Sequence, residues 1–182
     1  NHFIMKKLLI GALVGALILF VWQFLSFALL GIHNSQMDHT PNQDAILKVL
    51  EENLEEGTYF IPRAEIGASM EQEEAIMNER MGKPWAMVSY HDSLSNNMGM
   101  NMFRVFVIDF ISAFLLAWLL MKMANLTFQT SVIASLAIGL IGYFTINYLN
   151  SVWFETNSIP DLIDAVVQWG LTGAWMGWWL TK

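Results

Sequence analysis

The stretch LLIGALVGALILFVWQFLSFALLGI, residues 8–32, decides the fold class. It is 25 residues long and carries no charge, whereas about 20 apolar residues are enough for a helix to cross a bilayer. Two lysines precede it, as in a signal peptide, but it exceeds the usual apolar length of about 7–15 residues and lacks a clear cleavage site. We therefore expect residues 5–32 to be a retained membrane anchor, and we leave residues 1–4, which precede the first Met, out of the functional interpretation.

Three more apolar runs follow, at residues 104–122, 128–149 and 160–181. Hydrophobic residues make up 55% of the chain, which is more than the roughly 45–50% of soluble domains. The sequence thus predicts a membrane α-helical protein, a four-helix transmembrane bundle with a small α+β extracytoplasmic domain, residues 33–103, inserted between the first and second helices. Because residues 122–127 form a short connection, we expect the second and third helices to be antiparallel neighbours.

Basic residues set the expected orientation. Placing both termini in the cytoplasm leaves most outer cations within the long insert, where they count little toward topology. The cytoplasmic cations are then Lys6, Lys7, Lys122 and Lys182. We expect a protein of the bacterial inner membrane, with residues 33–103 outside the cytoplasm.

The insert is acidic. Residues 32–103 hold 12 acidic and four basic side chains, a net charge of −8, and the chain has no cysteine. Such a surface repels nucleic acid and anionic lipid and leaves a basic partner or cations as candidates. We expect no nucleic-acid partner and no disulfide.

Turn and capping signals predict a helix–strand–helix–strand order in the insert. Thr40-Pro41-Asn42-Gln43 and Ser69-x-x-Gln72 both fit a capping box at a helix start. Residues 58–62 and 85–91 are rich in aromatic and β-branched side chains and predict two short strands. A domain of this size has a small core, so we expect it to lean on the membrane helices or on a partner.

Small residues at four-residue spacing indicate close helix contacts in three of the four membrane helices. The motifs are Gly11-x-x-x-Gly15, Ser135-x-x-x-Gly139 and Gly173-x-x-x-Gly177. Tryptophans near the ends of the apolar runs, from Trp22 to Trp179, are typical of interfacial belts.

Polar residues inside the apolar runs are candidates for function. The chief one is Asp109, and we expect Gln23, Asn147 and Gln168 to lie at a similar depth in the other helices. The four side chains can form either an interhelical hydrogen-bonding cluster or an ion or proton site. Asp161 and Asp164 begin the fourth run after Ser158, in a third capping pattern that favours acids at a helix start.

Imidazoles and thioethers near the membrane suggest a metal site for copper or zinc. The candidate ligands are His33, His39, His91, Met98, Met100 and Met102. An extended segment would place the three alternating thioethers on one side. Against the site, no Cys or HExxH-like pattern fixes a geometry, and Met is ordinary packing material.

Catalytic signals are weak. Ser89, Ser93 and Ser95 lie near His91, but no nucleophile elbow or phosphate-binding loop accompanies them. We name no catalytic residue and expect no enzymatic activity.

Several short motifs carry a resemblance to a group of uncharacterised bacterial inner-membrane proteins with four spans and one extracytoplasmic insert. They are Trp22 with His33, Pro41-Asn42-x-Asp44, Glu56-Gly57-x-Tyr59-x-x-Pro62, Pro84-x-Ala86-x-x-x-Tyr90-His91 and Trp153-Phe154. The resemblance implies the architecture and no reaction, and it marks His33, Asp44, Tyr59 and His91 for mutation.

Three functions remain open from the sequence. The first is a non-enzymatic accessory or scaffold subunit in the lipid bilayer, which binds another membrane protein or itself. The second is binding or sensing of copper or zinc at the outer face. The third is a small oligomeric transporter or proton-coupled element centred on Asp109.

Overall fold

The computed structural model describes residues 2–182, so Asn1 lies outside the described residues. The chain divides into two compact units, each described by itself below. The helical unit runs up to Asp38 and resumes from Asn97 to Lys182, and the insert unit is His39–Asn96. The insert unit lies within residues 33–103, and an extracytoplasmic domain over that range remains a prediction.

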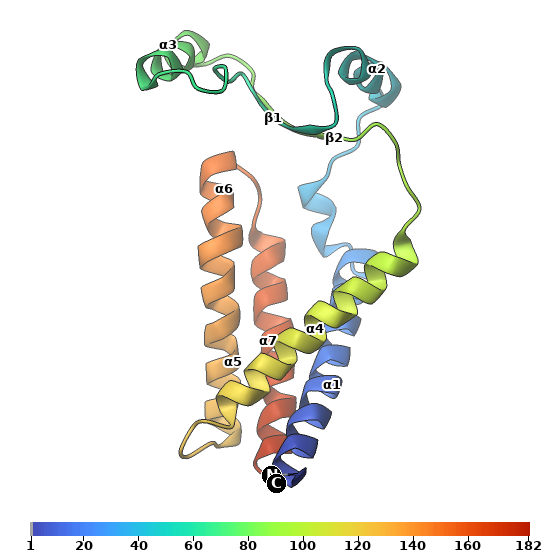
Figure 1. The fold of residues 1–182 in the computed structure, drawn as a ribbon, viewed down its shortest axis with the longest axis vertical. Coiled ribbons are helices and arrows are strands. Elements are labelled where there is room, and N and C mark those ends of the chain that lie inside the picture. The colour runs from blue at the N-terminus through green and yellow to red at the C-terminus, as the bar shows by residue number, and fades with distance from the viewer. Residues whose placement is uncertain (1) are drawn as a thin grey trace. The chain divides into compact units, whose positions relative to one another are not determined.

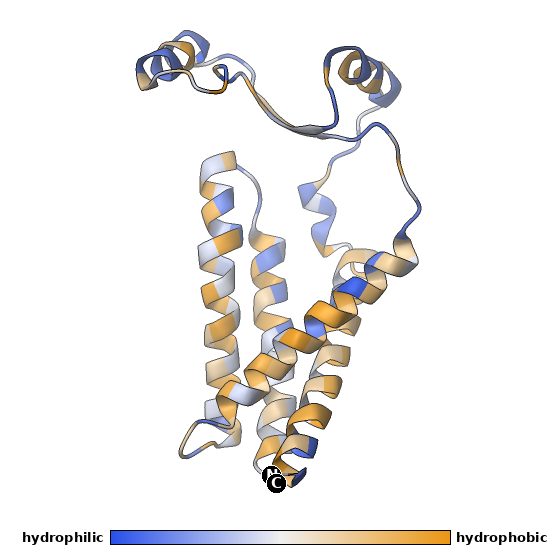
Figure 2. Ribbon diagram, in the orientation of Figure 1, coloured by the Kyte–Doolittle hydropathy of each residue, from blue (hydrophilic) through white to orange (hydrophobic). Residues whose placement is uncertain are grey.

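Long helices make up the helical unit (Figure 1). Helix α1, His2–Phe24, continues into a π-helical turn, Leu25–Leu29, and α4 spans Met98–Leu120. Helix α5, Phe128–Gly142, runs through the π-helical segment Tyr143–Tyr148 into α6, Leu149–Phe154. These three stretches, His2–Leu29, Met98–Leu120 and Phe128–Phe154, are long and apolar enough to cross a membrane, and much of their ribbon has the orange of hydrophobic residues in Figure 2. They are consistent with a membrane protein.

Helix α7, Ile159–Leu180, is the fourth predicted span. It forms as a helix, but among residues 2–182 it is not one of the helices that meet the apolarity expected of a span. Its two aspartates, its glutamine and its many Trp and Gly residues lower its mean hydropathy. The structure therefore supports three apolar spans, and a four-helix transmembrane bundle remains a prediction.

The helices of the helical unit pack in a different arrangement from the one that the short connection at residues 122–127 predicts. Helices α1 and α4 pack together, α7 packs against α1, and α5 packs against α7 (Figure 1). Helices α4 and α5 barely touch, so the prediction that the second and third apolar helices are neighbours is not met in the packing: α5 lies against α7 and α4 against α1. The short connection joins their ends only, and the small-residue faces decide which helices pack.

The close helix contacts predicted from the small-residue motifs are confirmed. A Cβ added at Gly15 would lie 2.8 Å from Met176 Cε and 3.0 Å from Ala113 Cβ, which joins α1 to α7 and α4. A Cβ at Gly173 would lie 2.6 Å from Ser135 Cβ, and one at Gly139 would clash with the Trp169 ring. The backbones approach as closely as they do because these positions carry little or no side chain.

The insert unit has the predicted helix–strand–helix–strand order. Helices α2, Gln43–Asn53, and α3, Met70–Arg80, alternate with strands β1, Gly57–Ile61, and β2, Ala86–Tyr90. The strands are antiparallel, with Gly57 opposite Tyr90 and Ile61 opposite Ala86.

The two capping predictions in the insert have different outcomes. Ser69 accepts from the Gln72 backbone N–H at 3.3 Å and its own N–H donates to Gln72 Oε1 at 2.9 Å, so this capping box is confirmed. The box predicted at Thr40 is wrong, because α2 begins at Gln43 after the N-cap residue Asn42, which has no capping side-chain bond. Thr40 instead accepts from the backbone N–H of Asn42 in the preceding turn.

Candidate functional site

A sharp turn after α1 builds the candidate site. Gly31 has φ +63°, a left-handed conformation that glycine adopts without strain, and the 3₁₀ turn Ile32–Gln36 follows it. This turn packs against α7 and against the π-helical end of α1. It therefore carries the side chains of His33 and Gln36 back onto the first turns of α7.

His33 forms a buried ion pair with Asp164. Its Nε2 lies 2.8 Å from Asp164 Oδ2, and His33 is 6% exposed. The Phe27 ring stacks on the imidazole with centroids 3.7 Å apart and planes at 10°. The apolar cover on one face and the carboxylate at the edge fix the imidazole in one orientation.

Asp164 gathers donors from α1 as well. Its Oδ1 accepts from Trp22 Nε1 at 2.9 Å and from the fully buried Ser26 hydroxyl at 2.6 Å. Trp22 and Ser26 are four residues apart and so lie on one face of the helical segment. Side chains of α1 and of the turn after it thus converge on one carboxyl group of α7.

Gln36 fixes the protonation of the imidazole. Its Nε2 donates to Asp161 Oδ2 at 2.7 Å and to the Asn157 carbonyl at 2.8 Å, which leaves its Oε1 to accept from His33 Nδ1 at 2.6 Å. The hydrogen-bond network thus assigns Nδ1 as a protonated nitrogen of His33, and Nε2 faces the Asp164 carboxyl group.

The surroundings of His33 favour the protonated form of its imidazole. Burial lowers the pKa of His33, but its hydrogen bonds to Gln36 and Asp164 and the negative charges of Asp164 and Asp161 raise it more. The pKa of His33 therefore lies above its ordinary value of 6.5.

A second polar group lies between α1, α4 and α7. Gln23 Nε2 donates to Asp109 Oδ1 at 3.0 Å and lies 3.5 Å from Gln168 Oε1. Asp109 is 4% exposed, and within residues 2–182 its Oδ2 is the buried side-chain polar atom that has no hydrogen-bond partner. This group brings together three of the four residues expected from the sequence.

The fourth expected residue, Asn147, lies elsewhere. Its Nδ2 donates to Asp161 Oδ1 at 2.9 Å, so it belongs to the network at the start of α7 rather than to the Asp109 group. Asp161 consequently accepts from both Gln36 and Asn147. Asn147 lies on the π-helical segment Tyr143–Tyr148 and so meets α7 at Asp161, seven residues before Gln168.

The capping pattern expected at Ser158 does not form. Ser158 is the N-cap of α7 but has no capping side-chain bond, and its hydroxyl lies 3.1 Å from the Tyr143 hydroxyl. Asp161 and Asp164 bind side chains of other segments, which explains why they begin this helix. Hydrogen bonds between helices replace the local cap.

The candidate metal ligands are dispersed over both units. His33 belongs to the ion pair, His39 Nδ1 lies 2.7 Å from Gln43 Nε2, and His91 Nδ1 lies 2.9 Å from Glu56 Oε1. Among the described residues, no group of three or more His, Cys, Asp or Glu side chains is arranged to hold a metal ion. Copper or zinc binding stays a prediction without structural support.

The methionine run is helical, not extended. Helix α4 begins at Met98, so Met98 and Met102 share one helix face while Met100 lies on another. The expectation that all three thioethers face one side is therefore wrong. A single site that uses all three would need this helix start to unwind.

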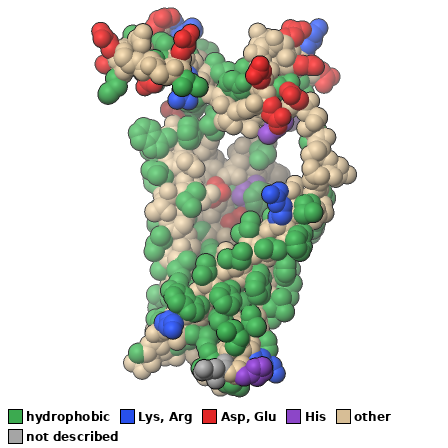
Figure 3. All heavy atoms as spheres, viewed as in Figure 1, with side chains coloured by type: hydrophobic (Ala, Val, Ile, Leu, Met, Phe, Trp, Pro, Cys, Tyr) green, Lys and Arg blue, Asp and Glu red, His purple; other side chains and the backbone are tan. Residues whose placement is uncertain are grey.

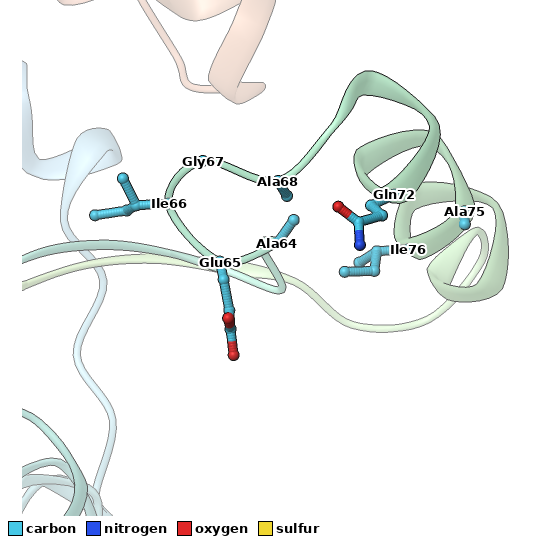
Figure 4. Close-up of a pocket in the computed structure, with 8 residues that line it drawn as sticks. All are labelled: Ala64, Glu65, Ile66, Gly67, Ala68, Gln72, Ala75 and Ile76. Atoms are coloured by element: carbon cyan, nitrogen blue, oxygen red, sulfur yellow. The ribbon is translucent and has the colours of Figure 1, made fainter.

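A hollow of about 500 Å³ lies in the insert unit, between residues 64–68 and α3. Figure 4 shows Ala64, Ala68, Gln72 and Ile76 turned toward one another, while Ile66 points away. Ile66 is 98% exposed. The lining also includes the polar side chains of Glu65 and Gln72.

Sequence reasoning missed the partners of Asp164. Trp22 was assigned to an interfacial belt, and Ser26 and Gln36 were not singled out. A usable signal exists on α7, where Asp161, Asp164, Gln168 and Thr172 recur at spacings of three and four and so form one polar stripe. Comparisons with protein-family models, with curated proteins and with solved structures found no match to this chain.

Proposed function

We propose that this chain is a non-enzymatic integral membrane protein, an accessory or scaffold subunit whose extracytoplasmic insert binds a partner membrane protein. The observation that carries the proposal is the missing core of the insert. Within residues 39–96, all of which the structure describes, Tyr90 is the single buried hydrophobic residue. Burial of apolar surface is the main stabilising term in folding, so such a unit gains most of its stability from a surface outside itself.

Exposed apolar side chains on α2 and α3 mark the binding face. On α2, Ile46 is 47% exposed and Leu47 55%; on α3, Met70 is 87% exposed and Met77 56%. Methionine side chains adapt to differing partner shapes, and exposed apolar patches on a folded unit favour protein contacts.

Charge indicates the chemistry of the partner. Three of the four basic side chains in the insert lie 3.9 Å from glutamates, while most of its acidic side chains gather on the surface of α2 and α3 (Figure 3). A partner with basic groups around an apolar centre complements this surface, and steering by opposite charge speeds association.

The helical unit supports anchoring in the membrane with both termini on one side. Lys7 Nζ donates to the Leu180 carbonyl at 2.9 Å, and Lys182 Nζ lies 3.5 Å from the Trp178 ring centroid. Clustered lysine and tryptophan at one end of the unit are typical of a cytoplasmic interface. In this proposal α7 is the fourth span, because α1 and α5 pack against it and its polar stripe is satisfied within the unit.

Isolation from native membranes in mild detergent tests the proposal. We expect the wild-type protein to retain one partner chain, or a second copy of itself, at fixed stoichiometry. The double variant Ile46→Gln with Leu47→Gln should lose that partner, because polar side chains remove the apolar face without opening a core.

The matched control is Lys48→Gln on the same helix, which should retain the partner. A strictly monomeric wild-type particle whose insert is stable by itself would contradict the proposal. Equal partner recovery from the wild type and the double variant would also contradict it.

A further inference from the structure

Asp109 is a buried carboxyl group with one unpartnered oxygen, a feature that the proposed scaffold function does not explain. It is an acid within the apolar helix α4, it is 4% exposed, and its Oδ2 has no hydrogen-bond partner among the described residues. The ion pairs of residues 2–182 do not include Asp109, so no Lys or Arg neutralises it. An isolated ionised carboxylate in such surroundings is strongly destabilising.

The charged groups around Asp109 do not change this conclusion. The titratable residues of α7 in this half of the unit, Asp161 and Asp164, are acids and supply no positive charge. His33, on the turn after α1, is held by Asp164, and Arg104 on α4 is exposed. The lysines of α1 lie at the opposite end of the unit, near Leu180.

The orientation of the Gln23 amide distinguishes between a metal cation and a proton as the group that neutralises the Asp109 carboxylate. Its Nε2 is shared between Asp109 Oδ1 and Gln168 Oε1, so the amide presents N–H groups where a metal cation needs oxygens. The N–H groups occupy one side of the carboxylate and leave Oδ2 open. A proton bound to Oδ2 removes the charge and needs no further ligand.

We propose that Asp109 is an intramembrane proton-binding site, in which a solvent proton forms an O–H bond at Oδ2 and converts the carboxylate to a neutral carboxyl group. Gln23 and Gln168 position that group. The polar stripe of α7, from Gln168 through Asp164 to Asp161, leads from Asp109 to the end of the unit that carries His33 and indicates the side from which the proton arrives. The site adds a proton-binding role to the proposed scaffold function and does not depend on it.

Infrared spectroscopy of the full-length protein tests the proposal. The protein is labelled with ¹³C at its aspartate carboxyl carbons and held in an ester-free detergent, so that lipid esters do not mask the signal. We expect the carbonyl stretch of a protonated carboxyl group to grow as the pH is lowered from neutral to mildly acidic. That band should disappear in Asp109→Asn and persist in the control Asp44→Asn, which changes an exposed aspartate on α2.

Thermal stability gives a second measurement. At mildly acidic pH, Asp109→Asn replaces a neutral carboxyl with a neutral amide of the same shape, so the unfolding temperature at that pH should not change. Absence of the protonated-carboxyl band in the wild type would overturn the proposal, as would a marked stabilisation by Asp109→Asn. Loss of the band on adding sodium would also overturn it, because a cation would then occupy the site.

Discussion

Removal of His33 should loosen the attachment of the 3₁₀ turn to α7. The His33–Asp164 pair is 2.8 Å long, and the side-chain exposures are 6% and 12%. Loss of one partner of a buried ion pair costs about 3–5 kcal/mol of unfolding free energy. Asp164 keeps two hydrogen-bond donors, Trp22 and Ser26, when His33 is removed, so we expect His33→Ala to cost about 3 kcal/mol, the low end of that range.

Asp164→Ala should cost more, about 5 kcal/mol. It breaks the same pair and also leaves the Trp22 indole N–H and the Ser26 hydroxyl without an acceptor, and each unsatisfied buried group costs about 1–3 kcal/mol. His33 offsets part of this loss, because it can release a proton and become neutral once the carboxylate is gone. Because the two variants remove one shared interaction, the double variant should cost less than the sum of the singles by about 2 kcal/mol.

Asp164→Asn is the matched conservative change. The new amide oxygen still accepts from Trp22 and Ser26, and its N–H group can donate to the unprotonated Nε2 of a neutral His33. We expect a loss of about 1 kcal/mol, the usual size of one net hydrogen bond.

Equilibrium unfolding in mixed micelles measures all four variants. The order should be Asp164→Ala, His33→Ala, Asp164→Asn, from most to least destabilised. If His33→Ala and Asp164→Ala both left the unfolding midpoint unchanged, or if their costs added fully in the double variant, the ion pair would not hold the turn and the reasoning would be refuted.

Three further predictions concern pH, packing and capping. Because the pKa of His33 in the folded protein is raised above 6.5, the pair stabilises fully below about pH 6.5 and is lost as pH rises through the folded pKa. The protection of amides in the turn after α1, relative to their intrinsic exchange rate at each pH, should therefore fall at alkaline pH in the wild type but not in His33→Ala, and equal pH profiles of protection in the two proteins would count against the pair. Gly139→Ala should cost about 1–3 kcal/mol because its Cβ meets the Trp169 ring, whereas Gly142→Ala on the same helix meets nothing within 4 Å; equal unfolding midpoints for the two would contradict the packing. Ser69→Ala should cost about 1 kcal/mol of α3 stability, read as faster amide exchange in that helix alone, while Thr40→Ala, which caps no helix, should leave α2 unchanged.

Features that depend on local pattern could be predicted from the sequence. Apolar runs located the helices, turn residues located the two strands of the insert, and small residues at four-residue spacing located the contacts of Gly15, Gly139 and Gly173. The capping box at Ser69 was predicted because both of its partners lie within one turn. Each of these features is determined by residues close together in the chain.

Features that depend on distant contacts could not be predicted in this way. The side-by-side packing of α5 with α7 and of α1 with α4 depends on which faces meet, and loop length does not determine that. Asp161 and Asp164 fit a helix-start pattern, and their true partners lie more than a hundred residues away in Gln36, Ser26 and His33. Gly31 provides the turn that brings His33 to Asp164, and nothing near it in the sequence indicates where that turn leads.

The most direct test of the proposed function is hydrogen exchange of the insert in two settings, in native membranes and in the purified single chain. We expect the amides of α2 and α3 to exchange quickly in the purified chain, because the insert has no closed core, and slowly in native membranes, where a partner covers its apolar face. The amides of α1 and α7 should be protected in both. Equally slow exchange of α2 and α3 in the purified single chain would show that the insert is stable by itself and would contradict the proposed function.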